Sequence, residues 1–248
     1  MKYNIFTLFN SKYIKFAKIF LNSLYKTQNM DNINTIYIYD AGINDADKEW
    51  LQKFDKIKII DDYETTQMDK IPEWTNVIIQ KTFILKQLLE KEKVYPLVMI
   101  DIDCLFLKDI SDLINLKFDL QVCKRDYKPK PLIASFVSFN NENVLPFIDL
   151  WIDKIKNIEK NIKETPALCN IYKKHKEDYK IGLVDYNIVS ATNDKSIKKD
   201  TRIFHFKGTS LKSNSVENRL KIINSLHKIK NIKQLIKKYI GTTKCTTW

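Results

Sequence analysis

The sequence predicts an α/β fold with a mostly parallel central sheet flanked by helices. Short segments rich in β-branched and aromatic residues alternate along the chain with longer segments whose apolar residues recur at helical spacing. The run 97–100 (Leu-Val-Met-Ile) is apolar throughout, as in a strand buried on both faces of a parallel sheet. Only four Gly and six Pro interrupt the 248 residues, and no internal repeat is present. This length fits one α/β domain with a helical appendage.

The individual elements follow from local patterns. Each expected strand is a short apolar or β-branched run, and the second ends at the turn signal Asp40-Ala41-Gly42. The expected strands are 4–9, 35–39, 57–60, 97–100, 118–123, 133–139 and 202–205. The expected helices are 13–24, 74–92 and 144–158, where apolar residues repeat every three or four positions.

Composition narrows the class of protein. A hydrophobic fraction of 44% supports a packed core and excludes wholesale disorder. The four cysteines show no zinc-site spacing, so we expect reduced thiols rather than disulfides. No apolar run approaches the roughly 20 residues that a membrane-spanning helix needs, and the N-terminal segment lacks the apolar centre of a signal peptide. We therefore expect a cytoplasmic protein, either free or peripheral on the inner membrane face.

Two acids stand directly after the most apolar strand. Asp101 and Asp103 follow the run 97–100, so they lie at the carboxyl edge of the predicted sheet, where ligands of open α/β folds bind. Strand alternation predicts that both side chains point to one side and Ile102 to the other. Carboxylates beside a core need a counter-charge, which Mg²⁺ or Mn²⁺ shared with a phosphate would supply. The alternative is a strand that simply ends in solvent.

A second apolar strand ends near a histidine. His205 is followed by Lys207 and Gly208, with Lys212 just beyond. An imidazole can complete a metal site, glycine allows close backbone approach, and lysine neutralises phosphate. If the strand continues, Lys207 faces away from His205, so Lys212 is the preferred phosphate ligand. Alone, this histidine also fits an ordinary hydrogen-bonded side chain.

The order of these motifs resembles a known family. Thr7-Leu8, Tyr13, Lys81, Asp101-Ile102-Asp103 and His205-Phe206-Lys207-Gly208 are similar to the GT-A-fold glycosyltransferases, and most of all to family 8, the glycogenin and lipopolysaccharide galactosyltransferase group. The resemblance covers roughly residues 3–213. The Asp-x-Asp motif followed by a late His-x-x-Gly is its most specific part.

The resemblance implies a donor site. Asp101, Asp103 and His205 would bind Mn²⁺ or Mg²⁺, and the ion would hold the diphosphate of a UDP-sugar. The other implied donor-binding residues are Thr7, Leu8 and Tyr13 around the uracil, Lys81 at the donor, and Gly208 with Lys212 over the diphosphate. Tyr13 also fits a core aromatic, and Lys81 a solvated helix residue.

The sequence departs from the family pattern at three places. Residues 133–136 (Ile-Ala-Ser-Phe) replace an Asn-Ser-Gly-like segment, which leaves the donor sugar open. The family's Asp-Gln step near the reacting carbon is matched to Asp185-Tyr186, so Asp185 is the candidate catalytic carboxylate, with its role as base, orienting group or structural acid open. No Pro-Trp follows Lys212.

The positive charge is concentrated at the C-terminal end. Of the net charge of +12, residues 195–248 carry 14 Lys/Arg against two acids. Residues 219–240 form an apolar helical stripe bordered by lysines, as in a helix that lies on an anionic membrane surface. The stripe also fits packing on the catalytic body, and nucleic-acid binding is disfavoured because the tail has little Arg and no recognition fold. We expect a catalytic domain at 1–213 and a basic helical tail at 214–248.

The sequence thus predicts a hexosyltransferase that uses a UDP-sugar and a glycan or lipid-linked acceptor, retaining by the family resemblance. One alternative is a non-catalytic protein with this fold that binds membrane or nucleic acid through its tail. Another is a phosphatase of the haloacid dehalogenase type, which also has a strand ending in Asp-x-Asp. That class expects small and hydroxyl residues after the motif, whereas 104–106 are Cys-Leu-Phe.

Overall fold

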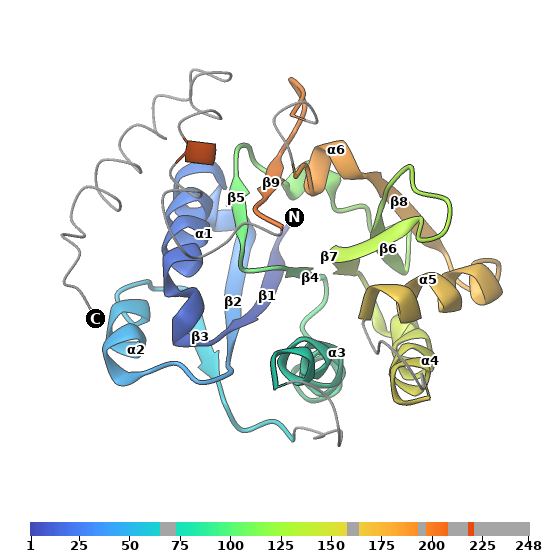
Figure 1. The fold of residues 1–248 in the computed structure, drawn as a ribbon, viewed down its shortest axis with the longest axis horizontal. Helices are drawn as coiled ribbons and strands as arrows, with labels where there is room; N and C mark the ends of the chain where they lie inside the picture. The colour runs from blue at the N-terminus through green and yellow to red at the C-terminus, as the bar shows by residue number, and fades with distance from the viewer. Residues whose placement is uncertain (65–72, 158–163, 193–196, 208–217, 221–248) are drawn as a thin grey trace.

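The computed structural model describes residues 1–64, 73–157, 164–192, 197–207 and 218–220 (Figure 1). In chain order the strands are β1 (Tyr3–Phe9), β2 (Ile33–Asp40), β3 (Ile57–Ile60), β4 (Leu97–Ile100), β5 (Cys104–Phe106), β6 (Leu120–Lys124), β7 (Leu132–Phe139), β8 (Ile181–Asp185) and β9 (Ile203–His205). The α-helices are α1 (Ile14–Thr27), α2 (Asp45–Leu51), α3 (Glu73–Glu92), α4 (Leu145–Lys156), α5 (Glu164–His175) and α6 (Tyr186–Val189). Short 3-10 turns are η1 (Ser11–Tyr13), η2 (Met30–Asn32), η3 (Ser111–Leu113) and η4 (Glu142–Val144).

A seven-stranded sheet forms the centre of the fold, in the order β3-β2-β1-β4-β7-β6-β8. All neighbouring pairs are parallel except those that β7 makes with β4 and β6, so β7 alone runs in the reverse direction in this sheet. Strands β5 and β9 form a separate antiparallel ribbon. The predicted α/β architecture with a mostly parallel central sheet is confirmed.

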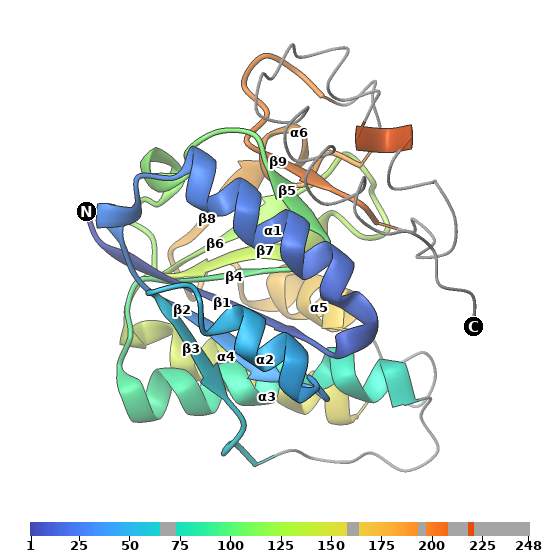
Figure 2. The ribbon, with the colours of Figure 1, turned by 90° about the vertical axis from the view of Figure 1, so that its left-hand side faces the viewer.

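Helices cover both faces of the sheet (Figures 1 and 2). One face packs on α1 and α2, and its core includes Ile5 and Val98. The other face packs on α3, α4 and α5, and its core includes Phe6 and Met99. Neighbouring residues of one strand thus enter opposite cores, which is why these strands are apolar at every position rather than alternating.

The carboxyl ends of β1, β4, β6 and β8 lie at the same edge of the sheet, because these strands are mutually parallel. The β5–β9 ribbon lies next to this edge, because β5 begins only a short turn after β4. The ribbon packs on α1, and Figure 2 shows it beside that helix. This edge is where the predicted acids, Asp101 and Asp103, are placed.

Several elements were not expected from the sequence. The short strand β5, the helices α2 and α5, and the edge strand β8 were missed, because each is short or lacks a clear apolar period. Most of the basic tail, including the expected helix 219–240 except its first two residues, lies outside the described residues. Among the helices that the structure describes, none is long and apolar enough to cross a membrane.

Candidate active site

A tight turn after β4 presents the two acids that the sequence singled out. Ile100 and Ile102 are buried, whereas Asp101 and Asp103 are partly exposed. The Asp101 N–H donates to the Ser135 carbonyl of β7 at 3.2 Å, which fixes the start of the turn. We expected strand alternation to orient both acids. Residues 101–103 instead lie between β4 and β5, so a turn and not a strand sets the direction of the two side chains.

The β5–β9 ribbon brings His205 to this turn from the far end of the described chain. His205 is paired in register with Cys104, and the Phe206 N–H donates to the Asp103 carbonyl at 2.8 Å. The Nε2 atom of His205 lies 3.1 Å from Asp103 Oδ1 and 3.7 Å from Asp101 Oδ2. The structure therefore brings all three predicted metal ligands together.

The His205 ring is fully buried and held from behind. Its Nδ1 lies 3.1 Å from Ser190 Oγ, which in turn lies 2.8 Å from Ser135 Oγ. Burial lowers the pKa of His205, but the charges of Asp103 and Asp101 raise it above its ordinary value on balance. When Nδ1–H is donated to Ser190, the lone pair of Nε2 points toward the carboxylates. Neither serine was identified from the sequence.

A buried ion pair supports Asp101 from the opposite side. The Nζ of Lys81, on α3, lies 2.6 Å from Asp101 Oδ1 and 3.0 Å from Glu164 Oε1. Burial lowers the pKa of Lys81, but the two carboxylates raise it above its ordinary value, so the ammonium stays charged. Burial raises the pKa of Glu164 to about 7 despite the Lys81 charge. The Oε2 of Glu164 is buried and has no hydrogen-bond partner among the described residues.

The donor atoms at the turn suit a hard divalent cation. Among the described residues, Asp103, Cys104 and His205 offer ligand atoms within 4.8 Å of one another. Burial, followed by the charges of Asp103 and Asp101, raises the pKa of the Cys104 thiol well above its ordinary value. A thiol must lose its proton to bind a metal, and Mg²⁺ and Mn²⁺ prefer oxygen ligands. Asp101 therefore fits such an ion better than Cys104.

Lys207 lies beyond the end of the strand that was expected to orient it. The prediction that it faces away from His205 assumed a continuing strand, but β9 ends at His205. Burial and the neighbouring charge of Arg125 lower the pKa of Lys207, while Asp101 and Asp103 act in the opposite direction. Its side chain is exposed, and it follows Phe206, whose N–H bonds the Asp103 carbonyl, so Lys207 lies next to the turn that carries the acids.

The residues expected around the nucleotide lie at the adjacent end of β1. Thr7 and Leu8 are buried, and Thr7 Oγ1 has no hydrogen-bond partner among the described residues. Tyr13 ends the η1 turn and is half-buried. Burial, and then the charge of Asp103, raises the pKa of Tyr13 above its ordinary value. Gly208 and Lys212 lie outside the described residues.

Asp185 lies apart from the acids. It ends β8, which is three strands from β4, or about 14 Å at ~4.8 Å per strand. Its exposed carboxylate accepts the Asn187 N–H at 2.6 Å and caps α6. Within the described residues, Asp185 makes no hydrogen bond or ion pair with the three candidate ligands. The buried carboxyl group beside Asp101 is instead Glu164, at the first turn of α5, for which the sequence gave no signal.

Fold and site together define a class: the architecture is the GT-A fold of glycosyltransferases. The galactosyltransferase LgtC, solved with donor and acceptor sugar analogues, matches with a TM-score of 0.59 at 12% identity, over 90% of this chain and 95% of LgtC. Mouse xyloside xylosyltransferase 1 gives 0.59 at 11% identity, over 84% of this chain and 98% of that one. The bifunctional glycosyltransferase WbbM gives 0.62 at 10% identity, over 94% of this chain and 51% of WbbM.

No protein-family model and no curated protein matches the sequence. At these identities the structural likeness concerns the fold. It confirms the predicted resemblance to GT-A glycosyltransferases and does not favour the phosphatase alternative.

Proposed function

We propose that this chain is a metal-dependent glycosyltransferase that moves a hexose from a UDP-sugar to a glycan or lipid-linked acceptor with retention of configuration. The observation that carries the proposal is the convergence of Asp101, Asp103 and His205 at the carboxyl edge of a GT-A sheet. Carboxylates and an imidazole form a ligand set that suits Mn²⁺ or Mg²⁺. UDP and retention follow from the resemblance to family 8.

The chain's own residues would prepare the site for a diphosphate leaving group. When bound, the ion supplies electrostatic stabilisation of the negative charge that develops on that group. Lys81 holds Asp101 in position from one side, and Ser190 holds His205 from the other. Lys207 adds a cation directly after Phe206, whose N–H bonds the Asp103 carbonyl.

The sheet order supports separate sides for the two substrates. Thr7 and Leu8 lie in β1 and Tyr13 ends the turn that follows it, on the β1 side of β4, which suits the uridine. The acceptor would enter on the β7, β6 and β8 side, where Asp185 is available as an acceptor-orienting carboxylate. Residues 1–213 would form the catalytic domain, and the tail 214–248 would bind an anionic membrane surface at the cytoplasmic side.

Sugar-nucleotide turnover tests this proposal. UDP release from UDP-glucose, UDP-galactose and their N-acetyl forms is measured with Mn²⁺, with Mg²⁺ and with a chelator. We expect turnover of one donor that requires the metal. Asp103→Asn should reduce it by about 100-fold or more, since even residues behind a metal ligand contribute 10- to 100-fold.

The matched control is Asp149→Asn, an exposed acid on α4 that pairs with Lys86 at 2.6 Å. This variant removes the same charge from a helix that carries none of the proposed metal ligands, and it should leave turnover unchanged. Metal-dependent UDP binding without turnover of any donor would favour the non-catalytic alternative. Donor turnover that persists at full rate in Asp103→Asn would refute the metal assignment.

A further inference from the structure

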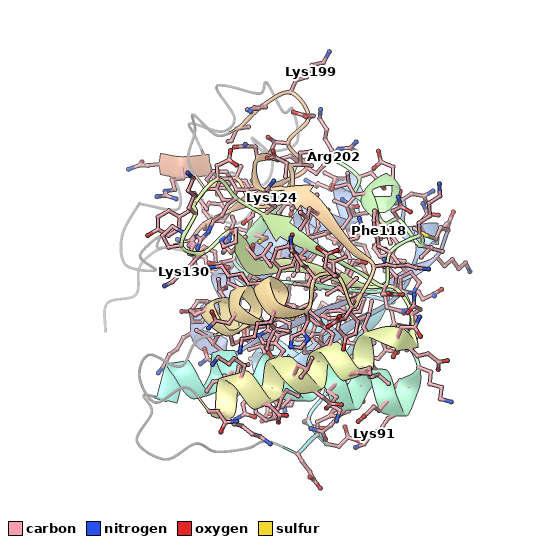
Figure 3. The ribbon with its side chains drawn as sticks, turned by 90° about the vertical axis from the view of Figure 1, so that its right-hand side faces the viewer. Lys91, Phe118, Lys124, Lys130, Lys199 and Arg202 are labelled. Atoms are coloured by element: carbon pink, nitrogen blue, oxygen red, sulfur yellow. The ribbon has the colours of Figure 1, made fainter. Side chains whose placement is uncertain are left out.

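A group of cations lies at the same edge of the sheet as the candidate active site and is separate from the proposed metal ligands. Residues 124–130 (Lys-Arg-Asp-Tyr-Lys-Pro-Lys), which we call the basic loop, contain four cations and one acid. The loop begins at the last residue of β6 and leads into β7. Figure 3 shows Lys124 and Lys130 on this face of the molecule, well away from Lys91.

The sheet order places the basic loop on the acceptor side. β6 and β4 are separated only by β7, so these two strands lie about 10 Å apart at ~4.8 Å per strand. Asp101 bonds Ser135 of β7, and Lys124 is paired with Leu132 of the same strand, so the basic loop projects beyond Asp101 at this edge. The proposed nucleotide residues lie at β1, on the other side of β4. The donor diphosphate at Asp101 and the basic loop therefore occupy neighbouring but distinct positions along the edge.

Lys207 lies at the metal-site end of this edge, because it follows Phe206, whose N–H donates to the Asp103 carbonyl at 2.8 Å. Its side chain is exposed. At the other end, Lys124 is paired in register with Asp185 across β6 and β8, so the basic loop begins beside the candidate acceptor-orienting carboxylate.

The basic loop is an ordered turn rather than a loose row of lysines. Arg125 Nε donates to the Lys130 carbonyl at 2.7 Å, and the Arg125 N–H donates to the Pro131 carbonyl at 2.8 Å. The Lys130 N–H donates to the Tyr127 carbonyl at 3.0 Å. The Arg125 guanidinium lies 5.3 Å from the Tyr127 ring centroid, in cation–π range. The backbone and the ring hold Arg125 in one place.

The terminal nitrogens of Arg125 remain available for a ligand. They make no hydrogen bond to any residue that the structure describes, and within those residues no ion pair joins Lys124, Arg125, Lys130 or Lys207 to a carboxylate. Tyr127 is 53% exposed, an unusual state for an aromatic ring at the rim of a site. The nearby acids are Asp126 and Asp185, fewer than the cations.

We propose that Arg125 binds an acidic group, a carboxylate or a phosphate, carried by the acceptor close to the hydroxyl that receives the sugar, and that Tyr127 covers the acceptor ring. This inference rests on the proposed function. A guanidinium forms paired hydrogen bonds with either acid, and a flat aromatic ring packs well on the apolar face of a pyranose. The acceptor is then an acidic glycan or a phosphate-bearing sugar.

Ligand binding tests the inference on the full chain loaded with UDP and Mg²⁺. Saturation-transfer NMR measures the affinities of glucuronic acid, glucose 6-phosphate and neutral glucose. We expect both or one of the acidic probes to bind more tightly than glucose, which identifies carboxylate or phosphate as the preferred group. Arg125→Gln should weaken the acidic probe by about tenfold, the loss expected for a hydrogen bond to a charged group. Arg125→Lys should retain part of the affinity.

The control variant is Lys91→Gln, which removes one charge at the end of α3 and should leave all affinities unchanged. UDP binding to Arg125→Gln should also be unchanged, and UDP binding to the wild type separately tests the proposed function. Acidic and neutral probes that bind equally, or not at all, to a UDP-loaded protein would overturn the inference. It is equally overturned if Arg125→Gln weakens UDP, or weakens only binding to phosphatidylglycerol vesicles.

Discussion

The His205 ring lies between a serine hydroxyl and two carboxylates. Ser190 lies on its Nδ1 side, and the carboxylates of Asp103 and Asp101 lie on its Nε2 side. Because the ring is buried, its orientation is set by these partners and not by solvent. At this scale the site is a set of aligned side chains, and each partner of His205 should affect how well the ring binds a cation.

Replacing Ser190 tests this alignment. Ser190→Ala removes the Nδ1 partner, so the ring loses the hydrogen bond that fixes its tautomer. We expect Mn²⁺ affinity, measured by isothermal titration calorimetry in the presence of UDP, to fall by about 10- to 100-fold. Ser138→Ala is the matched control, since Ser138 is also a buried hydroxyl of the same fold but bonds Asn140. An equal loss in both variants would show a general structural effect and contradict the positioning role.

At the scale of elements, short segments carry much of the geometry. The β5–β9 ribbon has three residues in each strand, yet it joins the acids to His205. The edge strand β8 extends the sheet beyond β6 and leads into α6. Asp119 bonds the residue before β8, and Gly182 allows β8 to approach β6 closely. Each of these residues gives a separate prediction.

Asp119 ties three chain segments together at the start of β6. Its carboxylate accepts the Lys180 N–H at 2.9 Å and the side-chain amides of Asn141 and Asn143 at 3.0 and 3.2 Å. Burial raises the pKa of Asp119, but these hydrogen bonds lower it below its ordinary value on balance. The stabilisation is therefore present above the unfolded-state pKa of about 4 and is lost as pH falls through the lower folded-state pKa.

Asp119→Asn should lower the free energy of unfolding at pH 7 by about 1–3 kcal/mol. Urea denaturation at pH 7 and at pH 3 measures it, and the gap between wild type and variant should shrink at pH 3. Asp153→Asn, at an exposed acid of α4, is the control and should change little. A gap that stays constant across this pH range would contradict the assigned role.

Gly182 allows β8 to approach the residues before and within β6. A Cβ added at Gly182 would lie 2.6 Å from Phe118 Cδ2 and 2.9 Å from Gln121 Cγ. Figure 3 shows Phe118 at this margin of the molecule. Gly182→Ala should therefore destabilise the fold by about 1–3 kcal/mol in thermal or urea unfolding, as overpacking does. If the contact is the cause, adding Phe118→Ala should recover part of that loss; strictly additive effects would rule the contact out.

At the scale of the whole molecule, local sequence patterns predicted the layers of helices and strands and some of the residues of the candidate site. The apolar run 97–100 ending in two acids and the late His205 are visible within a few residues, so Asp101, Asp103 and His205 could be named from sequence. Glu164 could not, because one acid before a short amphipathic segment looks like an ordinary helix start. Ser190 reaches His205 only through the bridge between Ala191 and Phe204, and Lys207 follows β9, which pairs with β5.

Strand direction and order were also beyond the local pattern. β7 is as apolar as its neighbours, and nothing within residues 132–139 indicates that it runs against them. β7 pairs with β4, which lies more than thirty residues earlier in the chain. Such non-local pairing produces no periodic pattern of apolar residues in the sequence. The same holds for the basic loop, whose lysines carry no signal in the sequence and are brought by the sheet order to the edge that also carries Asp101.

The central claim is that Asp101, Asp103 and His205 share one divalent cation that also holds a nucleoside diphosphate. Electron paramagnetic resonance titration of Mn²⁺, with and without UDP, tests it most directly. The account predicts one bound Mn²⁺ whose affinity rises when UDP is added, with both effects lost in Asp103→Ala. Mn²⁺ binding that is indifferent to UDP, or that is unchanged in Asp103→Ala, would contradict the account.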